Sequence, residues 1–291
     1  MNFIGSKIKH SLAVYGILGT GLLCVKKAIQ YLIWLNPSYR QHLKIVQERD
    51  MQFDRKWGVE TSGTLVPTKS ETVGWGWLFG IRYQGCNADL LNDILGNISI
   101  KHDDFTFIDF GSGKGRAILV ASRFPFKKII GVEYSKKLIQ IARHNVTSFP
   151  NGEKRCREIK IFHANAATFP IPQGPLFIFL YNPFGRQVMR TLVKNVSVSF
   201  QQNPRRIILV YFHPLFADEW KKVGFFIEIR RSKEIAIYDT QSSGAFGHAG
   251  HKSVPTIFSS LHIILKGLLL GKELLLKRLL FRHNMNNAFY A

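Results

Sequence analysis

The stretch from Phe105 to Glu133 constrains the fold of this chain most strongly. It reads FTFIDFGSGKGRAILVASRFPFKKIIGVE: an aromatic strand, a turn with three glycines, the start of a helix, and a second strand that ends in an acid. Such a succession has the length of a crossover between two parallel strands. Glycines tolerate positive φ and let a ligand approach the backbone, and an acid on the second strand can bind ribose hydroxyls. We therefore expect an adenosine-containing cofactor at the carboxyl ends of parallel strands.

The spacing of the glycines separates two kinds of cofactor. The dinucleotide fingerprint G-x-G-x-x-G needs a third glycine where this chain has Arg116. The acid-x-G-x-G-x-G pattern resembles motif I of class I S-adenosylmethionine (SAM) methyltransferases, and GVEYS resembles their motif II. An ordinary glycine-rich turn is the alternative. In the family that this resembles, the first acid and the turn hold the amino-acid moiety of SAM, and the second acid holds its ribose. The cofactor residues implied here are Asp109, Gly111, Ser112, Gly113, Gly115, Glu133 and Tyr134.

Two further cofactor contacts rest on position. A strand predicted at residues 159–163 runs into HANAATFP, where the family usually has an acid that accepts a bond from the adenine amino group. This chain has Asn165 there, followed by Ala166, and an amide can both accept and donate. Before the glycine turn, Tyr83 precedes a predicted amphipathic helix at residues 87–98. We expect Tyr83 to reach the methionine end of the cofactor.

The segment after a fourth predicted strand, at residues 176–181, is the candidate acceptor site. It reads YNPFG and resembles the N-P-P-aromatic motif of amino-group methyltransferases, without the second proline. The resemblance implies that Asn182 orients a substrate amine and Phe184 walls the pocket, while Tyr181 lies near the sulfonium. The alternative is that Asn-Pro only ends a strand and begins a helix. His213, after a fifth strand, is expected to be structural.

The remaining pattern predicts the fold class. Predicted helices at residues 135–149, 188–200 and 216–223 alternate with strands, and two final strands at residues 225–230 and 234–239 form a hairpin. We expect an α/β fold with a Rossmann-like seven-stranded sheet of the class I methyltransferase type. Helices should cover both faces, and the sheet should be parallel except for a C-terminal hairpin strand. A dinucleotide-binding domain would not predict that hairpin.

The segment from Gln47 to Gly63 carries the second resemblance. Its FDRKWGVETSG sequence is polar, aromatic and not periodic, which predicts a loop. It is similar to an F-D-R-x-aromatic-G-V-x-T-S-G segment in a family of uncharacterised bacterial class I methyltransferases, and the likeness covers about residues 50–240. The loop would close over cofactor or substrate through Trp57, Thr61 and Ser62, or else be a structural wrap. We place the methyltransferase domain at residues 46–240.

Charge and the terminal segments suggest a surface partner. The 291 residues carry a formal net charge of +21, which attracts nucleic acid or acidic lipid. Residues 1–45 form an apolar and basic helical extension, residues 241–256 a linker, and residues 257–285 an amphipathic helix. Basic flanks with a large apolar face favour a helix that lies in an anionic membrane surface. The alternative is that these helices pack on the domain.

The three cysteines complete the expectations about cofactors and compartment. Cys24, Cys86 and Cys156 lie far apart in the chain, without the spacing of a metal site or of a disulfide framework. We therefore expect no metal. A reducing, cytoplasmic compartment fits best, with membrane association through the terminal helices.

The function predicted from these features is SAM-dependent methyl transfer, to an amine nitrogen of a protein or another acceptor. The sequence contains no convincing general base, which suits an amine better than an alcohol. GSGKG, GVEYS and the Asn after the fourth strand also resemble lysine methyltransferases of the Dot1 type. The alternatives are a nucleic-acid methyltransferase that uses the basic surface, and a non-catalytic SAM-binding module associated with membranes.

Overall fold

The computed structural model describes residues 35–63 and 84–241, together with Ile17, Thr20, Gly21, Cys24 and Tyr31 as isolated positions. Most of the predicted N-terminal extension, Tyr83, the predicted linker after residue 241 and the predicted helix at residues 257–285 lie outside the described residues. Within the described part of the chain, no helix is both long enough and apolar enough to cross a membrane.

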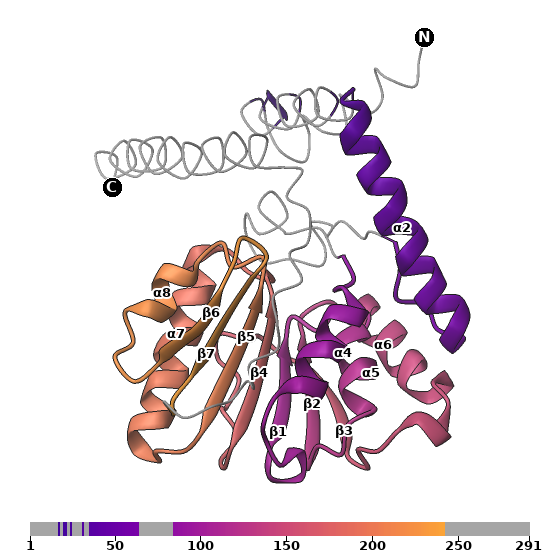
Figure 1. The fold of residues 1–291 in the computed structure, drawn as a ribbon. Coiled ribbons are helices and arrows are strands. Elements are labelled where there is room, and N and C mark those ends of the chain that lie inside the picture. Colours follow the sequence, from indigo (N-terminus) through magenta and orange to yellow (C-terminus); the bar gives the residue numbers. More distant parts are fainter. Residues whose placement is uncertain are drawn as a thin grey trace, which may run out of the picture. The chain divides into compact units, whose positions relative to one another are not determined.

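Seven strands form one sheet in the order β3-β2-β1-β4-β5-β7-β6 (Figure 1). The pairings that join β3, β2, β1, β4 and β5 are parallel, and β7 runs antiparallel to both β5 and β6. This confirms the predicted sheet, including its one reversed hairpin strand. The strands are β1 (Thr106–Phe110), β2 (Lys128–Glu133), β3 (Ile159–His163), β4 (Leu176–Tyr181), β5 (Ile207–Phe212), β6 (Ile227–Arg231) and β7 (Ile235–Asp239).

Helices cover both faces of the sheet because the strand side chains alternate between two apolar clusters. Phe107, Phe177 and Phe179 face a cluster with α4 and α5. Ile108 and Ile178 face the opposite cluster with α7 and Trp220 of α8. Figure 1 shows these two groups of helices on opposite sides of the strands. The helices are α2 (Pro37–Trp57), α4 (Ala88–Asn97), α5 (Arg116–Ser122), α6 (Lys136–Ser148), α7 (Arg186–Gln202) and α8 (Ala217–Lys221), with short 3₁₀ turns at His102–Asp104 and Asn151–Glu153.

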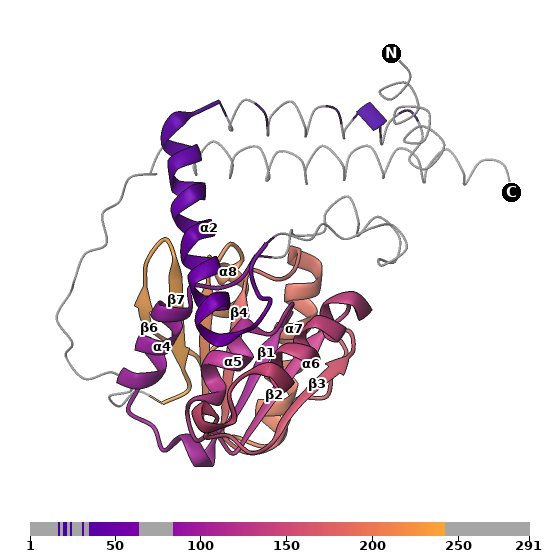
Figure 2. The same cartoon turned by 90° about the vertical axis from the view of Figure 1, so that its right-hand side faces the viewer.

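The first part of the predicted loop from Gln47 to Gly63 is a helix, so that prediction was wrong up to Trp57. Residues 47–57 form the end of α2, and a glycine with positive φ, Gly58, follows the helix. The apolar periodicity is weak because the inner face of this helix is partly charged. Asp50 and Asp54 lie one turn apart and both approach Arg116 at the start of α5. Figure 2 shows this end of α2 beside α5.

The sheet register gathers the predicted site at one edge. Asp109 of β1 lies beside Gly131 of β2 and Phe179 of β4, so the carboxyl ends of these three parallel strands meet. The segments that leave this edge are the glycine turn after β1, Glu133 at the end of β2 and Asn182 after β4. Ligands of open α/β sheets bind outside such strand ends, where the strand order reverses.

Candidate cofactor and acceptor site

Two carboxyl groups lie together beneath the glycine turn. Asp109 is buried in β1 with 3% of its surface exposed. Burial raises the pKa of Asp109 well above its usual value, and the charge of Glu133 raises it further. A buried acid next to a second acid favours a ligand that brings positive charge to this place.

Four N–H groups of the glycine turn are already bonded within the protein. Gly111 and Ser112 both donate to the Val132 carbonyl oxygen, at 2.8 and 3.1 Å, and Gly115 donates to the Ser112 oxygen at 2.8 Å. Gly113 donates to Oε2 of Glu133 at 2.9 Å. A phosphate-binding turn instead aims free N–H groups at its anion. This turn therefore suits a cationic ligand rather than a pyrophosphate.

Glu133 organises the end of β2. Its Oε1 accepts from the N–H groups of Tyr134 and Ser135, both at 2.8 Å, in addition to the bond from Gly113 to Oε2. A carboxylate has about four lone-pair sites, so Oε2 keeps room for a ribose hydroxyl. Ser112 contributes differently, because its hydroxyl is buried and has no hydrogen-bond partner among the described residues. A Cβ at Gly131 would lie 3.0 Å from that oxygen, so this side chain fills the space under the turn.

The segment after β4 packs directly on the glycine turn. Gly111 has φ +83°, and a Cβ there would lie 2.4 Å from Cβ of Pro183 and 3.5 Å from Cζ of Phe184. Only glycine allows this approach without displacing the proline. The contact joins the predicted cofactor turn to the predicted acceptor segment, which are about 70 residues apart in the sequence.

Asn182 occupies a backbone conformation that L-residues rarely adopt. Its φ is +39°, in the left-handed region. Its Oδ1 lies 3.5 Å from the hydroxyl of Tyr211, on the α7 side of the sheet. Tyr181 packs instead with the cluster on the α4 and α5 side, where its ring lies 5.3 Å from that of His213. Burial is the main cause that raises the pKa of both tyrosines, so each phenol stays protonated at neutral pH.

The sequence analysis missed a network that fixes residues 50–62, which we call the strap, to the glycine turn. Arg116, 2% exposed, donates to Oδ1 of Asp50 at 2.6 Å and to Oγ1 of Thr61 at 2.7 Å. Lys114 donates to Oε1 of Glu60 at 2.7 Å and to the Ser62 carbonyl oxygen at 2.8 Å. The partners of Arg116 lie far from it in the sequence and become its neighbours only in the folded chain. The sequence alone therefore did not reveal them.

Asp54 shapes the end of the strap. Its carboxylate accepts from the N–H and hydroxyl of Thr61 and from the N–H of Ser62, at distances from 2.5 to 2.9 Å. Trp57 lies elsewhere, with its ring 5.1 Å from that of Phe149. Of the three candidates in this segment, Thr61 and Ser62 thus approach the turn through Asp54, Arg116 and Lys114, whereas Trp57 packs on the end of α6.

The predicted adenine contacts lie on the loop after β3. Asn165 is exposed, and its Oδ1 accepts from the N–H of Ala167 at 2.9 Å. Ala166 is buried in the cluster on the α7 side. Tyr134 is 44% exposed, and its ring lies 6.2 Å from that of His163, the β3 residue paired with Glu133. These residues line one end of the carboxyl edge of the sheet.

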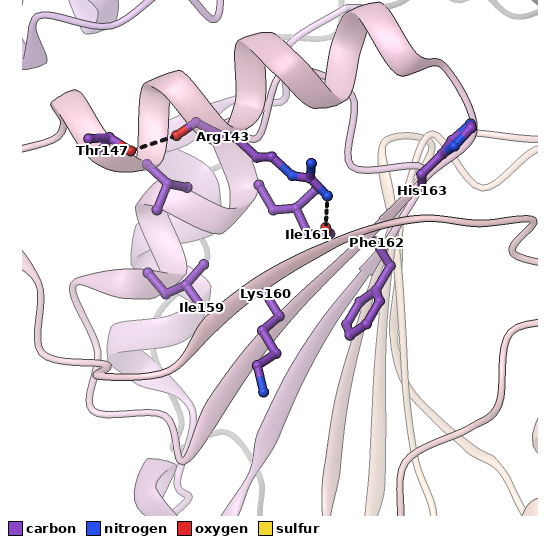
Figure 3. Close-up of a pocket in the computed structure, with 8 residues that line it drawn as sticks. Arg143, Thr147, Ile159, Lys160, Ile161, Phe162 and His163 are labelled. Atoms are coloured by element: carbon purple, nitrogen blue, oxygen red, sulfur yellow. Dashed lines mark hydrogen bonds between the residues drawn. The ribbon is translucent and has the colours of Figure 1, made fainter.

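A pocket of about 490 Å³ lies at the edge strand β3, between that strand and α6. Its lining is apolar and basic: Arg143, Ile159, Lys160, Ile161, Phe162 and His163 contribute to it. Figure 3 shows the guanidinium of Arg143 reaching the carbonyl oxygen of Ile161, a hydrogen bond of 2.9 Å. His163 lines the pocket and pairs with Glu133 at the end of β2. No sequence motif predicted this pocket. In the residues that the structure describes, no cluster of His, Cys, Asp or Glu is suited to a metal ion.

The sheet order defines a Rossmann-like domain, in which the glycine turn lies beside an acidic strand end. Residues 81–163, which include β1, the glycine turn and β2, match the family model described as "Histone methylation protein DOT1". The match to this family model, the sheet order and the preference of the turn for a cationic ligand agree on one class. The domain is a SAM-dependent methyltransferase, and its cofactor is S-adenosyl-L-methionine. Asp109, the glycine turn and Glu133 are the residues that fit this cofactor.

Comparisons with other proteins add little beyond the class. No curated protein matches the sequence. A predicted N6-adenine-specific DNA methylase from Listeria monocytogenes is 15% identical with a TM-score of 0.40, over 53% of this chain and 50% of that one. A ribosomal protein L11 methylase from Lactobacillus delbrueckii subsp. bulgaricus is 13% identical with a TM-score of 0.39, over 53% and 79%.

A third solved structure carries the cofactor itself. Magnesium protoporphyrin IX methyltransferase from Synechocystis, with bound SAM, is 12% identical with a TM-score of 0.37, over 52% of this chain and 75% of that one. The chain thus spans about half of the Listeria protein and more of the other two.

Proposed function

We propose that this chain transfers the methyl group of SAM to an amine nitrogen of a protein, with a lysine side chain as the acceptor. One observation carries the proposal: Pro183 and Phe184 pack on Gly111, so Asn182 leaves β4 next to the cofactor turn. The family model that matches residues 81–163 is that of a histone methylation protein, which supports a protein acceptor.

The residues around Asn182 suit a neutral amine. An amine attacks only when uncharged, and burial beside Phe184 and Tyr211, which both belong to the cluster on the α7 side, disfavours the charged form. The amide oxygen of Asn182 can accept an N–H bond and orient the lone pair. Tyr181 and Tyr211 remain protonated because their pKa values are raised, so neither phenol is a base at neutral pH. An alcohol acceptor would need such a base.

SAM supplies an activated methyl group, and the protein supplies binding and orientation. Asp109 and the glycine turn would hold the cationic amino-acid moiety, and Glu133 the ribose. The acceptor nitrogen, oriented by Asn182, would take the methyl group, S-adenosylhomocysteine would leave, and the proton released by the methylated amine would pass to water.

Asn182→Ala tests the proposal. We expect this variant to bind S-adenosylhomocysteine like the wild type and to lose at least a hundredfold in turnover, because the lost amide orients only the acceptor. Asn97→Ala is the matched control, since Asn97 is an exposed amide on α4 whose side chain, among the residues that the structure describes, bonds only to the Asp93 carbonyl oxygen. Unchanged turnover in Asn182→Ala would refute the role of this residue.

The acceptor class is tested with tritiated SAM and fractionated cell extract. A protein amine predicts label in the protein fraction that survives alkaline treatment and yields an N-methyl amino acid after acid hydrolysis. Base-labile label would indicate an ester, and label in the nucleic-acid fraction would favour the alternative based on the net charge of +21.

A further inference from the structure

One residue of α6, Asn145, forms hydrogen bonds with both the strap and the glycine turn. Asn145 of α6 is fully buried. Its Nδ2 donates to the carbonyl oxygens of Glu60 in the strap and Lys114 in the turn, both at 2.9 Å, and its Oδ1 accepts from the Glu60 N–H at 2.8 Å. One amide thus fixes the backbone of both segments to the same helix.

The second half of the turn and the start of the helix behind it are tied to the strap. Lys114 lies inside the turn and is held by Glu60 and the Ser62 carbonyl oxygen, and Arg116 begins the helix behind it and is held by Asp50 and Thr61. Gly85 adds a steric requirement, because a Cβ there would lie 2.4 Å from the Arg116 guanidinium. The guanidinium is therefore enclosed on several sides.

These bonds matter because the turn is intrinsically loose. Gly111, Gly113 and Gly115 all have positive φ, at +83°, +53° and +86°. Glycine loses more backbone freedom on ordering than any other residue. Without its outside anchors, a turn with three glycines would populate many conformations, and cofactor binding would have to order it.

We propose that the strap is a working part of the cofactor site: its docking holds the glycine turn in the conformation that binds SAM. Lys114, Arg116, Asn145 and Asp54 are then positioning residues for the cofactor, although none of them needs to contact it. This inference rests on the proposed class of cofactor and adds that the N-terminal helix α2 is coupled to its affinity.

Coupling of this kind is reciprocal. If docking of the strap strengthens cofactor binding, the cofactor must by the same factor strengthen docking of the strap. Amide hydrogen exchange in residues 54–63 should therefore slow when S-adenosylhomocysteine binds, although the strap is not required to touch the ligand. A wrap that serves stability alone would exchange at the same rate with and without ligand.

The test compares two variants of α2 in the full chain. Asp54→Asn keeps the shape of the side chain but removes one of the oxygens that hold Thr61 and Ser62. Glu48→Gln removes one carboxylate from an exposed ion pair with Arg55 on the same helix. Calorimetric titration with S-adenosylhomocysteine should give at least tenfold weaker binding for Asp54→Asn, and binding within twofold of the wild type for Glu48→Gln.

A milder variant guards against a folding defect. Thr61→Val replaces by a methyl group the hydroxyl that joins Asp54 to Arg116. We expect it to weaken ligand binding while the chain still unfolds cooperatively. Ligand affinity equal to wild type in both Asp54→Asn and Thr61→Val, or exchange in residues 54–63 that is the same with and without ligand, overturns the proposal. A wild-type chain that binds no S-adenosylhomocysteine overturns the cofactor assignment as well, whereas the amine assignment is tested separately by the labelling experiment with tritiated SAM.

Discussion

Asp109 is the residue whose chemistry says most about the ligand. It is buried, and burial raises its pKa well above 3.8. The negative charge of the neighbouring Glu133 raises the pKa further. A raised pKa means that the free protein retains a proton on Asp109 into a higher pH range. A cationic ligand favours the ionised carboxylate, so ligand binding must release that proton.

This linkage predicts a pH dependence with a definite sign. Affinity for S-adenosylhomocysteine should rise as pH increases from about 4 through the pKa of Asp109, because less free energy is then spent on removing the proton. Calorimetry in two buffers of different ionisation enthalpy should detect proton release in the same range. Asp109→Asn should bind more weakly and without pH dependence. Proton uptake, or affinity independent of pH in the wild type, would contradict the role of Asp109.

Gly111 offers a second test at the scale of single residues. Gly111→Ala adds a methyl group 2.4 Å from Cβ of Pro183 at φ +83°, and Gly174→Ala adds one at the same φ with nothing within 4 Å. Both variants carry the strain of the left-handed region, about 1–2 kcal/mol. We expect only Gly111→Ala to lose cofactor binding. We also expect its free energy of unfolding to fall further than that of Gly174→Ala, by about 3 kcal/mol in total relative to the wild type. Equal losses in urea denaturation would mean that the Pro183 contact is unimportant.

At the scale of elements, one buried carboxylate joins α7 to α8. Glu219 is 5% exposed and accepts from Arg186, Arg190 and Lys222. Burial works against its charge, but the bonds from Lys222, Arg186 and Arg190 outweigh burial and lower the pKa to about 2. A lowered pKa stabilises the folded state above the ordinary value of 4.5, and this contribution disappears as pH falls towards 2.

Glu219→Gln should therefore reduce the free energy of unfolding by about 2 kcal/mol at neutral pH, and flatten the loss of stability between pH 4.5 and 2. Asp218→Asn is the matched control, because Asp218 bonds to the same Arg186 but is 50% exposed. We expect a change within about 0.5 kcal/mol for the control. A Glu219 variant with wild-type stability in thermal unfolding at pH 7 would show that the three bonds only offset the cost of burial.

The elements that the sequence could predict are those with apolar inner faces. β1, β3 and β4 and the turn between β1 and α5 follow from runs such as LFIFLY and from the glycine spacing. α2 could not be predicted, since its buried face presents Asp50 and Asp54 to an arginine 60 or more residues away. Lys114 and Arg116 looked like ordinary turn and helix residues for the same reason: their partners become neighbours only in the folded sheet.

For the molecule as a whole, the net charge of +21 predicts attraction to anionic surfaces. The full chain should co-sediment with vesicles rich in an anionic phospholipid at low salt and be released as the ionic strength approaches 0.5 M, where charges are screened beyond about 4 Å. Vesicles of neutral phospholipid are the control. Equal binding to both kinds of vesicle would contradict the attraction by charge, and binding only to nucleic acid would argue against the predicted membrane association of the terminal segments.

The account depends most directly on the identity of the cofactor. Calorimetric titration of the full chain with S-adenosylhomocysteine, and separately with NADH, tests it in one experiment. We predict micromolar binding of S-adenosylhomocysteine, weakened in Glu133→Ala, and no binding of NADH, because four N–H groups of the turn are bonded within the protein and two acids lie beneath it. Binding of NADH, or of neither ligand, would contradict the assignment of the glycine turn to SAM.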